Sequence, residues 1–125
     1  MNLLISNTSD KPIYEQITSQ IKNLIISGRL KEGDPLPSMR ILAKELRISV
    51  ITTKRAYEEL EQAGFISTVV GKGSFVRATD TQVIREEKLK EIEGLLAKAV
   101  TVAQQSGISQ KEVYEIIDVI YQEEE

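Results

Sequence analysis

The sequence predicts a mostly α-helical fold with a small β-wing: an N-terminal winged helix-turn-helix over residues 1–77, followed by a two-helix segment over residues 78–125. Three observations predict it. Apolar residues recur at helical spacing in several stretches, a Gly-Lys-Gly turn separates two β-branched runs, and net charge changes sign between the two parts. A short polar junction, residues 78–81, divides them.

A first helix is expected over Pro12–Ser27. Pro12 suits the first helical position because its missing N–H needs no partner there, and Gly28 is typical of the residue just past a helix end. Ahead of this helix, Leu3–Ile5 is a candidate short strand. The apolar face of the helix consists of Ile13, Ile17, Ile21, Leu24 and Ile25.

Two shorter helices are expected next. Residues 31–37 are rich in Gly, Asp and Pro, which favour a loop over a helix interior. One helix then covers Ser38–Leu46, and a second covers Ser49–Ala63 with Ser49 as a good N-cap and Gly64 at its end. Together with the first helix they form a tri-helical unit that contains a helix-turn-helix. The buried stripe of the last helix is expected to be Thr53, Ala56, Tyr57 and Leu60.

A β-hairpin is expected directly after these helices. Residues 65–70 and 74–77 are rich in β-branched and aromatic side chains, and Gly71-Lys72-Gly73 forms the turn between them. A helix-turn-helix followed at once by a hairpin is a winged helix.

The rear part is expected to be two helices. The first covers Thr81–Gln105, about 40 Å at ~1.5 Å per residue, and Gly107 ends it. Ser109 and Glu112 form a capping box for the second. Two helices cannot enclose a drug-sized cavity, which needs roughly 300–1,000 Å³.

Two helices also cannot bury their apolar faces alone. We expect a helical bundle with a second copy, related to the first by a two-fold axis. The alternative is that both helices pack on their own winged helix. The residues expected at the dimer interface are Ile92, Leu96, Ala99, Val100, Ala103, Val113, Ile116, Ile117 and Ile120.

Composition excludes several classes of function. The chain has no His, Cys or Trp, which removes His-dependent nucleophiles, zinc sites with nitrogen or sulfur ligands, and disulfides. We therefore expect no enzyme and no cofactor. The acidic residues of the first rear helix are expected to be solvated rather than to bind a metal. Without a long apolar run or a signal-peptide pattern, the protein is expected to be cytoplasmic and not membrane-bound.

The charge is unevenly divided along the chain. The whole chain has a net charge of −3 and a pI of about 5.2, which by itself argues against a polyanionic partner. Residues 1–77, however, hold 11 Lys and Arg against 8 Asp and Glu, a net charge of +3. Residues 78–125 hold 5 against 11, a net charge of −6. The front part is thus suited to nucleic acid, and the acidic rear part would stay away from it.

The motifs between residues 12 and 76 resemble the GntR family of bacterial winged helix-turn-helix transcription regulators. The short length of the rear part is similar to the YtrA-like subgroup, whose remaining effector domain is two helices. The motifs that carry the resemblance are Leu36-Pro37-Ser38-Met39-Arg40, Leu42-Ala43, Ser49, Thr52-Thr53, Ala56, Leu60, Gly64-Phe65-Ile66 and Gly71-Lys72-Gly73-Ser74-Phe75-Val76.

The resemblance implies which residues contact DNA. Arg40, the arginine of the LPSxR motif, would bind phosphate or guanine edges, and the glycines of the wing let its backbone approach the minor groove. The recognition helix begins at Ser49, and its first turns would face the major groove. The implied DNA-binding residues are Arg40, Ser49, Val50, Ile51, Thr52 and Lys54 together with Gly71, Lys72 and Gly73 of the wing.

The chain departs from the family pattern at two places. Arg47 stands where the family usually has glycine, which implies either no left-handed turn there or one costing about 1 kcal/mol. Val50 stands where Arg or Asn is common. Val50 and Ile51 cannot hydrogen-bond to bases but can contact thymine methyl groups. Other residues have alternatives of their own: Thr52 can bond back to its own helix, and Arg55 can pair with nearby acids.

The sequence as a whole predicts a sequence-specific DNA-binding transcription regulator, a repressor that acts as a homodimer on a two-fold operator. The alternative is a winged helix that binds proteins rather than DNA, because a fold does not determine function. The sequence identifies neither the operator nor an effector ligand.

Overall fold

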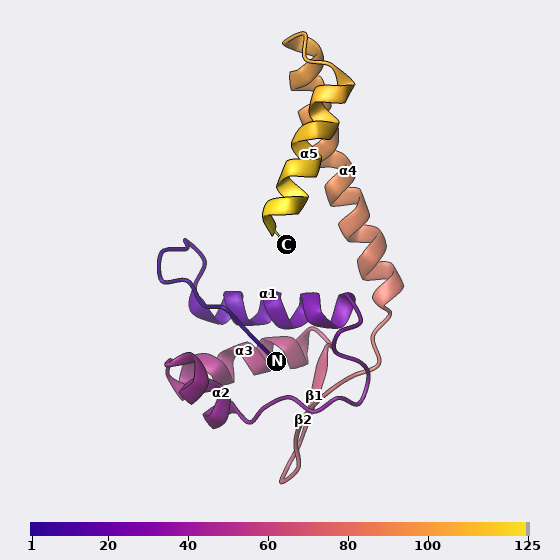
Figure 1. The fold of residues 1–125 in the computed structure, drawn as a ribbon. Helices are drawn as coiled ribbons and strands as arrows, with labels where there is room; N and C mark the ends of the chain where they lie inside the picture. The colour runs from indigo at the N-terminus through magenta and orange to yellow at the C-terminus, as the bar shows by residue number, and fades with distance from the viewer. Residues whose placement is uncertain (125) are drawn as a thin grey trace. The chain divides into compact units, whose positions relative to one another are not determined.

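The computed structural model describes residues 1–124 (Figure 1). Its helices and its antiparallel two-stranded sheet confirm the predicted fold class. Two compact units are present, Met1–Thr81 and a second that starts at Gln82. The elements in chain order are α1 (Ile13–Ile26), α2 (Met39–Leu46), α3 (Val50–Gln62), β1 (Ile66–Val69), β2 (Gly73–Val76), α4 (Thr81–Gln105) and α5 (Gln110–Glu124).

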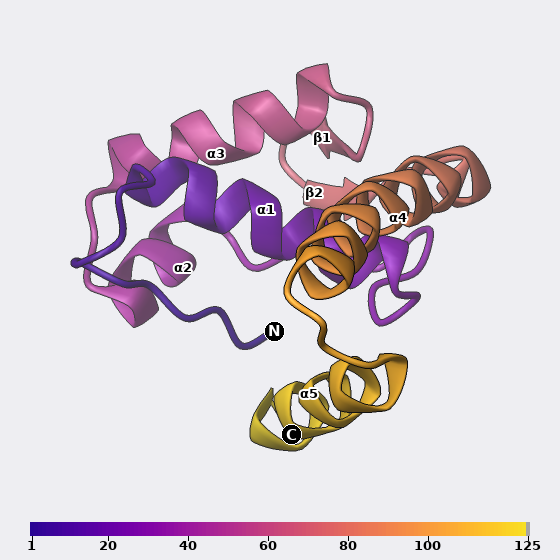
Figure 2. The same cartoon turned by 90° about the horizontal axis from the view of Figure 1, so that it is seen from above.

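The core of the first unit lies between its three helices. Figure 2 shows α1 beside α3, and α2 also packs against α3. Ile17 and Ile21 of α1 and Leu42 of α2 are fully buried, and each such side chain contributes roughly 1.5–3 kcal/mol on burial. The predicted stripe of α3 is confirmed, because each of its residues is at most 1% exposed: Thr53, Ala56, Tyr57 and Leu60.

Serine side chains begin the two helices of the helix-turn-helix. Ser38 Oγ accepts a hydrogen bond from the Ile41 N–H at 3.2 Å, and Ser49 Oγ accepts one from the Thr52 N–H at 3.1 Å. Each satisfies a backbone donor that the first helical turn leaves free. The predicted starts of α2 and α3 at these serines therefore agree with the structure to within one residue.

The turn between α2 and α3 contains a left-handed residue. Arg47 has φ of +57°, the one positive value among the non-glycine residues that the structure describes. The N–H groups of Arg47 and Ile48 donate to the carbonyls of Lys44 and Ala43, which satisfies the end of α2 in the pattern that favours glycine. Of the two alternatives at this position, the structure shows the left-handed turn. Because Arg47 is not glycine, this backbone conformation costs about 1 kcal/mol.

The wing is held to the loop before α2. β1 and β2 pair from Ile66 opposite Val76 to Val69 opposite Gly73. On its other edge β2 bonds to the loop: the Leu36 N–H donates to the Ser74 carbonyl at 2.9 Å. An isolated β-bridge between Pro35 and Phe75 thus fixes the base of the wing to the loop that leads into α2.

The N-terminal segment is not a strand, so the expectation for Leu3–Ile5 was wrong. The Leu4 backbone bonds instead to the Gln20 side chain of α1, which accepts from its N–H at 2.8 Å and donates to its carbonyl at 2.6 Å. Gln16 binds the Ser6 N–H and carbonyl in the same manner. Side-chain amides one helical turn apart therefore satisfy an extended segment that has no neighbouring strand.

The second unit is a helical hairpin. Gly107 turns the chain with φ of +68°, and the predicted capping box is present: Ser109 Oγ accepts from the Glu112 N–H while Glu112 accepts from the Ser109 N–H. The helices α4 and α5 diverge away from this turn (Figure 1). No helix within residues 1–124 combines the length and the apolar character needed to cross a membrane.

Candidate nucleic-acid interface

Arg40 lies exposed in the first turn of α2, directly after a loop that is fixed to the core. The anchor is Tyr57 of α3, whose hydroxyl donates to the Pro37 carbonyl at 2.7 Å. Burial and, to a smaller extent, the charge of Glu45 raise the pKa of Tyr57, which keeps the hydroxyl protonated as a donor. This hydrogen bond ties the chain three residues before Arg40 to α3.

The first turn of α3 contains two hydroxyl groups that bind each other. Ser49 Oγ and Thr52 Oγ1 are 2.8 Å apart, and Ser49 also caps the helix. Thr52 does not bond back to its own helix; its neighbour Thr53 does, donating to the Ser49 carbonyl at 3.3 Å. Both hydroxyls proposed to contact DNA therefore have partners within the free protein.

Apolar side chains form the outermost part of the same turn. Ile51 is 80% exposed and Val50 is 45% exposed. With ~100° of rotation per residue, Ile51 lies opposite the buried stripe that includes Ala56 and Leu60. It therefore occupies the middle of the exposed face of α3.

The next two cations of α3, Lys54 and Arg55, form ion pairs with acids further along the helix. Lys54 Nζ lies 3.9 Å from Glu58, and Arg55 Nε lies 3.7 Å from Glu59. The Arg55 guanidinium also lies 3.8 Å from the centre of the Tyr14 ring of α1. Each cation is paired with an acid one turn nearer the C-terminus of α3. The alternative expected for Arg55, an ion pair within the protein, is present.

The wing tip is a tight turn with one exposed cation. The Lys72 N–H donates to the Val69 carbonyl at 2.9 Å, and Gly71 has φ of +78°, as a type II turn requires at this position. Lys72 is exposed, and Val70 beside it is 98% exposed. In Figure 1 the hairpin projects from the same side of α1 as α2 and α3.

A protein-family model described as "Bacterial regulatory proteins, gntR family" matches residues 13–76. The match spans more than half of the chain and includes α2, α3 and the wing. The chain belongs to the GntR family. The expected resemblance is confirmed, and it places the chain among transcription regulators rather than enzymes.

Individual relatives of this GntR-family chain agree with that assignment. The HTH-type transcriptional repressor YtrA of Bacillus subtilis (strain 168) is 35% identical over 116 residues, which is 93% of this chain and 89% of YtrA. The solved structure of YtrA from Sulfolobus acidocaldarius, a GntR-family transcription factor, aligns with a TM-score of 0.59 and 35% identity over 74% of this chain and 97% of that one. AraR(DBD) in complex with operator ORX1 aligns with a TM-score of 0.53 and 26% identity over 59% of this chain and 92% of that one.

The predicted DNA-binding residues all lie in the first unit of this GntR-family chain. Thr52 is half-buried and the other eight are exposed. Their grouping by element is Arg40 on α2, Ser49 to Lys54 around the first turn of α3, and Gly71 to Gly73 at the wing. The sequence analysis did not identify Tyr14 as the ring that Arg55 contacts or Pro37 as the acceptor of the Tyr57 hydroxyl. It also did not identify Val70 as an exposed residue of the wing tip. The pairing of Tyr57 with Pro37 leaves no sequence signal, because it joins residues 20 positions apart.

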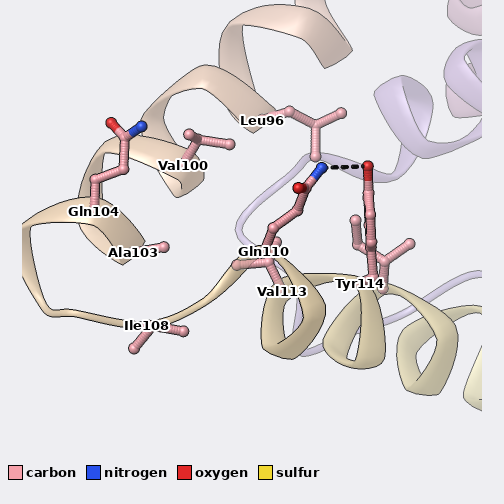
Figure 3. A pocket seen from close by; sticks show the side chains of 9 residues that line it. Leu96, Val100, Ala103, Gln104, Ile108, Gln110, Val113 and Tyr114 are labelled. Carbon is pink, nitrogen blue, oxygen red and sulfur yellow. Dashed lines mark hydrogen bonds between the residues drawn. The ribbon is translucent and has the colours of Figure 1, made fainter.

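The second unit of this GntR-family regulator presents an open apolar groove between α4 and α5. Its volume is about 450 Å³ (Figure 3). At its edge, the Gln110 side chain donates to the Tyr114 hydroxyl at 2.8 Å. Five of the nine residues predicted for a dimer interface line it: Leu96, Val100, Ala103, Val113 and Ile117. Of the nine, Ala103 is buried, Val113 and Ile117 are half-buried, and the other six are exposed.

Proposed function

We propose that this chain is a repressor that binds double-stranded operator DNA as a homodimer. One observation carries the proposal: a single unit presents an exposed Arg40, an exposed first turn of α3 and an exposed Gly-Lys-Gly wing. Residues 1–77, which contain all three, have a net charge of +3. Phosphate binding depends on such cations, and the remaining exposed groups are small enough for close approach.

In the proposed complex α3 enters the major groove by its N-terminal end. Its C-terminal half carries the acids Glu58, Glu59 and Glu61, which phosphates repel. Its first turn carries no acid and has the positive end of the helix dipole. Arg40 then reaches the flanking backbone or a guanine edge, and Lys72 reaches phosphates beside the minor groove.

We further propose that residues 1–77 are the DNA-binding domain and residues 78–125 the dimerisation segment. Large apolar side chains of the rear helices are open to water, including Ile92 at 50%, Ile116 at 55% and Ile120 at 53% exposed. Large exposed apolar side chains in such number are typical of an interaction site. A second copy is the partner that buries it, because α4 and α5 then form a four-helix bundle with a two-fold axis.

The proposal that the regulator represses rests on its relatives. YtrA of Bacillus subtilis, with which it shares 35% identity over 93% of its length, is a transcriptional repressor by name. A dimer bound at a promoter blocks access of other proteins to the same DNA. No part of this mechanism needs an activating contact.

A gel-shift titration with the DNA upstream of its own gene tests DNA binding. Arg40→Ala and Lys72→Ala are each expected to weaken binding about tenfold, and Lys72→Ala should also reduce the slope of affinity against salt by about one unit. Lys90→Ala, an exposed lysine of α4, is the matched control and should leave binding unchanged. Unchanged binding in both interface variants would contradict the proposal. If the chain binds a protein partner with an affinity that does not change with salt concentration, the protein-interaction alternative is favoured.

A further inference from the structure

We infer that the first turn of α3 recognises the 5-methyl group of thymine through Ile51, so that each operator half-site contains a thymine whose methyl group this side chain contacts. The inference rests on the proposed function and specifies what the recognition helix reads. It concerns base identity, not the overall strength of DNA binding.

The position of Ile51 is the first step. Its side chain is 80% exposed and lies opposite the buried stripe of α3, in the turn that would reach deepest into the groove. A single exposed apolar residue is ordinary on a protein surface. Here it occupies the place from which a recognition helix reads base edges, with Val50 beside it at 45% exposed.

The second step is that the polar side chains in and next to this turn already have partners within the protein. Ser49 and Thr52 have their hydroxyl groups bound to each other at 2.8 Å, and Ser49 also caps the helix. Lys54 and Arg55 form ion pairs with Glu58 and Glu59, which lie one turn further along the helix. The outermost group that meets the bases is therefore hydrocarbon.

The third step is the chemistry of the major groove. Guanine, adenine and cytosine present hydrogen-bond donors and acceptors there, whereas thymine alone adds a methyl group. An isoleucine against a donor or acceptor would remove water from it without replacing the hydrogen bond. Against a thymine methyl group both surfaces lose water favourably, so the geometry selects thymine.

The size of the effect follows from burying one methyl group. It corresponds to about a fourfold loss of affinity when the methyl group is removed at one half-site. Removal at both half-sites of a dimer then gives about a sixteenfold loss. Base pairing and the phosphate contacts of Arg40 and Lys72 are unaffected by this change.

The experiment replaces thymine by deoxyuridine, which lacks only the methyl group. A bound duplex is first selected from random DNA with the full chain, and each thymine of one half-site is then replaced singly. We expect one position, or two adjacent ones, at which deoxyuridine weakens binding about fourfold. At the same position 5-methylcytosine should bind more tightly than cytosine by a similar factor.

Variants of the protein assign the effect to Ile51. Ile51→Ala should bind thymine and deoxyuridine duplexes equally, while Leu4→Ala, a control residue 82% exposed on the N-terminal segment, should keep the fourfold difference. The inference is overturned if no thymine shows a methyl effect, or if the effect survives in Ile51→Ala. A chain that binds no duplex at all would overturn the proposed function as well, which separates the two failures.

Discussion

At the scale of single residues, the helix-turn-helix depends on Arg47 in its turn and on Tyr57 in its core. Arg47 holds a left-handed backbone at φ of +57° in the turn, at a cost of about 1 kcal/mol. Tyr57 offsets such costs, because its buried hydroxyl ties α3 to the Pro37 carbonyl. The loop that precedes Arg40 is thus tied to α3 by a side chain of the core.

Replacing Tyr57 by Phe tests this anchor. Tyr57→Phe should lower the free energy of unfolding by about 1–3 kcal/mol near pH 8, because the Pro37 carbonyl loses its buried partner. Burial raises the pKa of Tyr57, so its folded state prefers the neutral hydroxyl. The stability it provides is therefore complete below about pH 10 and is lost as pH rises further.

Urea unfolding at pH 8 and pH 11 measures both effects. The difference between the wild-type chain and Tyr57→Phe should shrink at the higher pH, since only the wild type must keep this hydroxyl protonated. Tyr121→Phe, at a side chain that is 70% exposed, is the control and should differ little from wild type at either pH. If the difference in free energy of unfolding between wild type and Tyr57→Phe were the same at both pH values, the Tyr57 hydroxyl would not be a buried donor.

At the scale of elements, α3 combines folding and recognition in one turn. Ser49 caps the helix and stands where DNA would lie, whereas Ser109 caps α5 in the acidic second unit. The acids of α3 are confined to its second half, from Glu58 onward. Stability and DNA binding can therefore be separated by a change that keeps the cap and alters only the charge.

Ser49→Asp is such a change. Asp caps helices as well as Ser does, so thermal stability should stay within about 0.5 kcal/mol of wild type. DNA affinity in a gel shift should fall at least tenfold, because a carboxylate then faces the phosphates. Ser109→Asp is the matched control: the same substitution at another cap should preserve both stability and binding. Full DNA binding by Ser49→Asp would place the first turn of α3 away from DNA.

At the scale of the whole molecule, the proposed dimer accounts for the exposed apolar side chains of the rear helices. Helix α4 has a single buried residue, Ala103, and α5 has none among the residues whose side chains the structure describes. Side chains such as Leu96 and Ile120 face water in the isolated chain. Exposed apolar surface marks an interaction site, and in the proposed dimer two copies bury these apolar faces against each other.

Leu96→Glu tests the dimer. Light scattering of the wild-type chain should give about twice the chain mass of 14.0 kDa. Leu96→Glu places a charge in the proposed interface, so the variant should be a monomer and should bind a two-fold operator at least tenfold more weakly. Lys98→Glu, an exposed position on the same helix, should leave the mass unchanged. A monomeric wild type at tens of micromolar would contradict the bundle.

Local patterns in the sequence were sufficient to predict the elements themselves. Helix periodicity, the serines at positions 38, 49 and 109, and the glycines at 64 and 107 placed the start of every helix, and the ends of the first four, to within about two residues. The buried stripe of α3 was also predictable, because its residues recur every three or four positions. The short strand expected at Leu3–Ile5 failed, since two glutamines of α1 satisfy that backbone.

The sequence alone determined the fold class, the family and the residues that face outward on α2, α3 and the wing. These follow from caps, turns and periodicity, which act over a few residues. Only the tertiary structure decided which distant groups the side chains near the interface contact: Tyr57 donates to the Pro37 carbonyl, and Arg55 lies on the Tyr14 ring. Both pairings join residues far apart in the chain. Packing decides them, and Ile51 is left as the outermost group of the recognition helix.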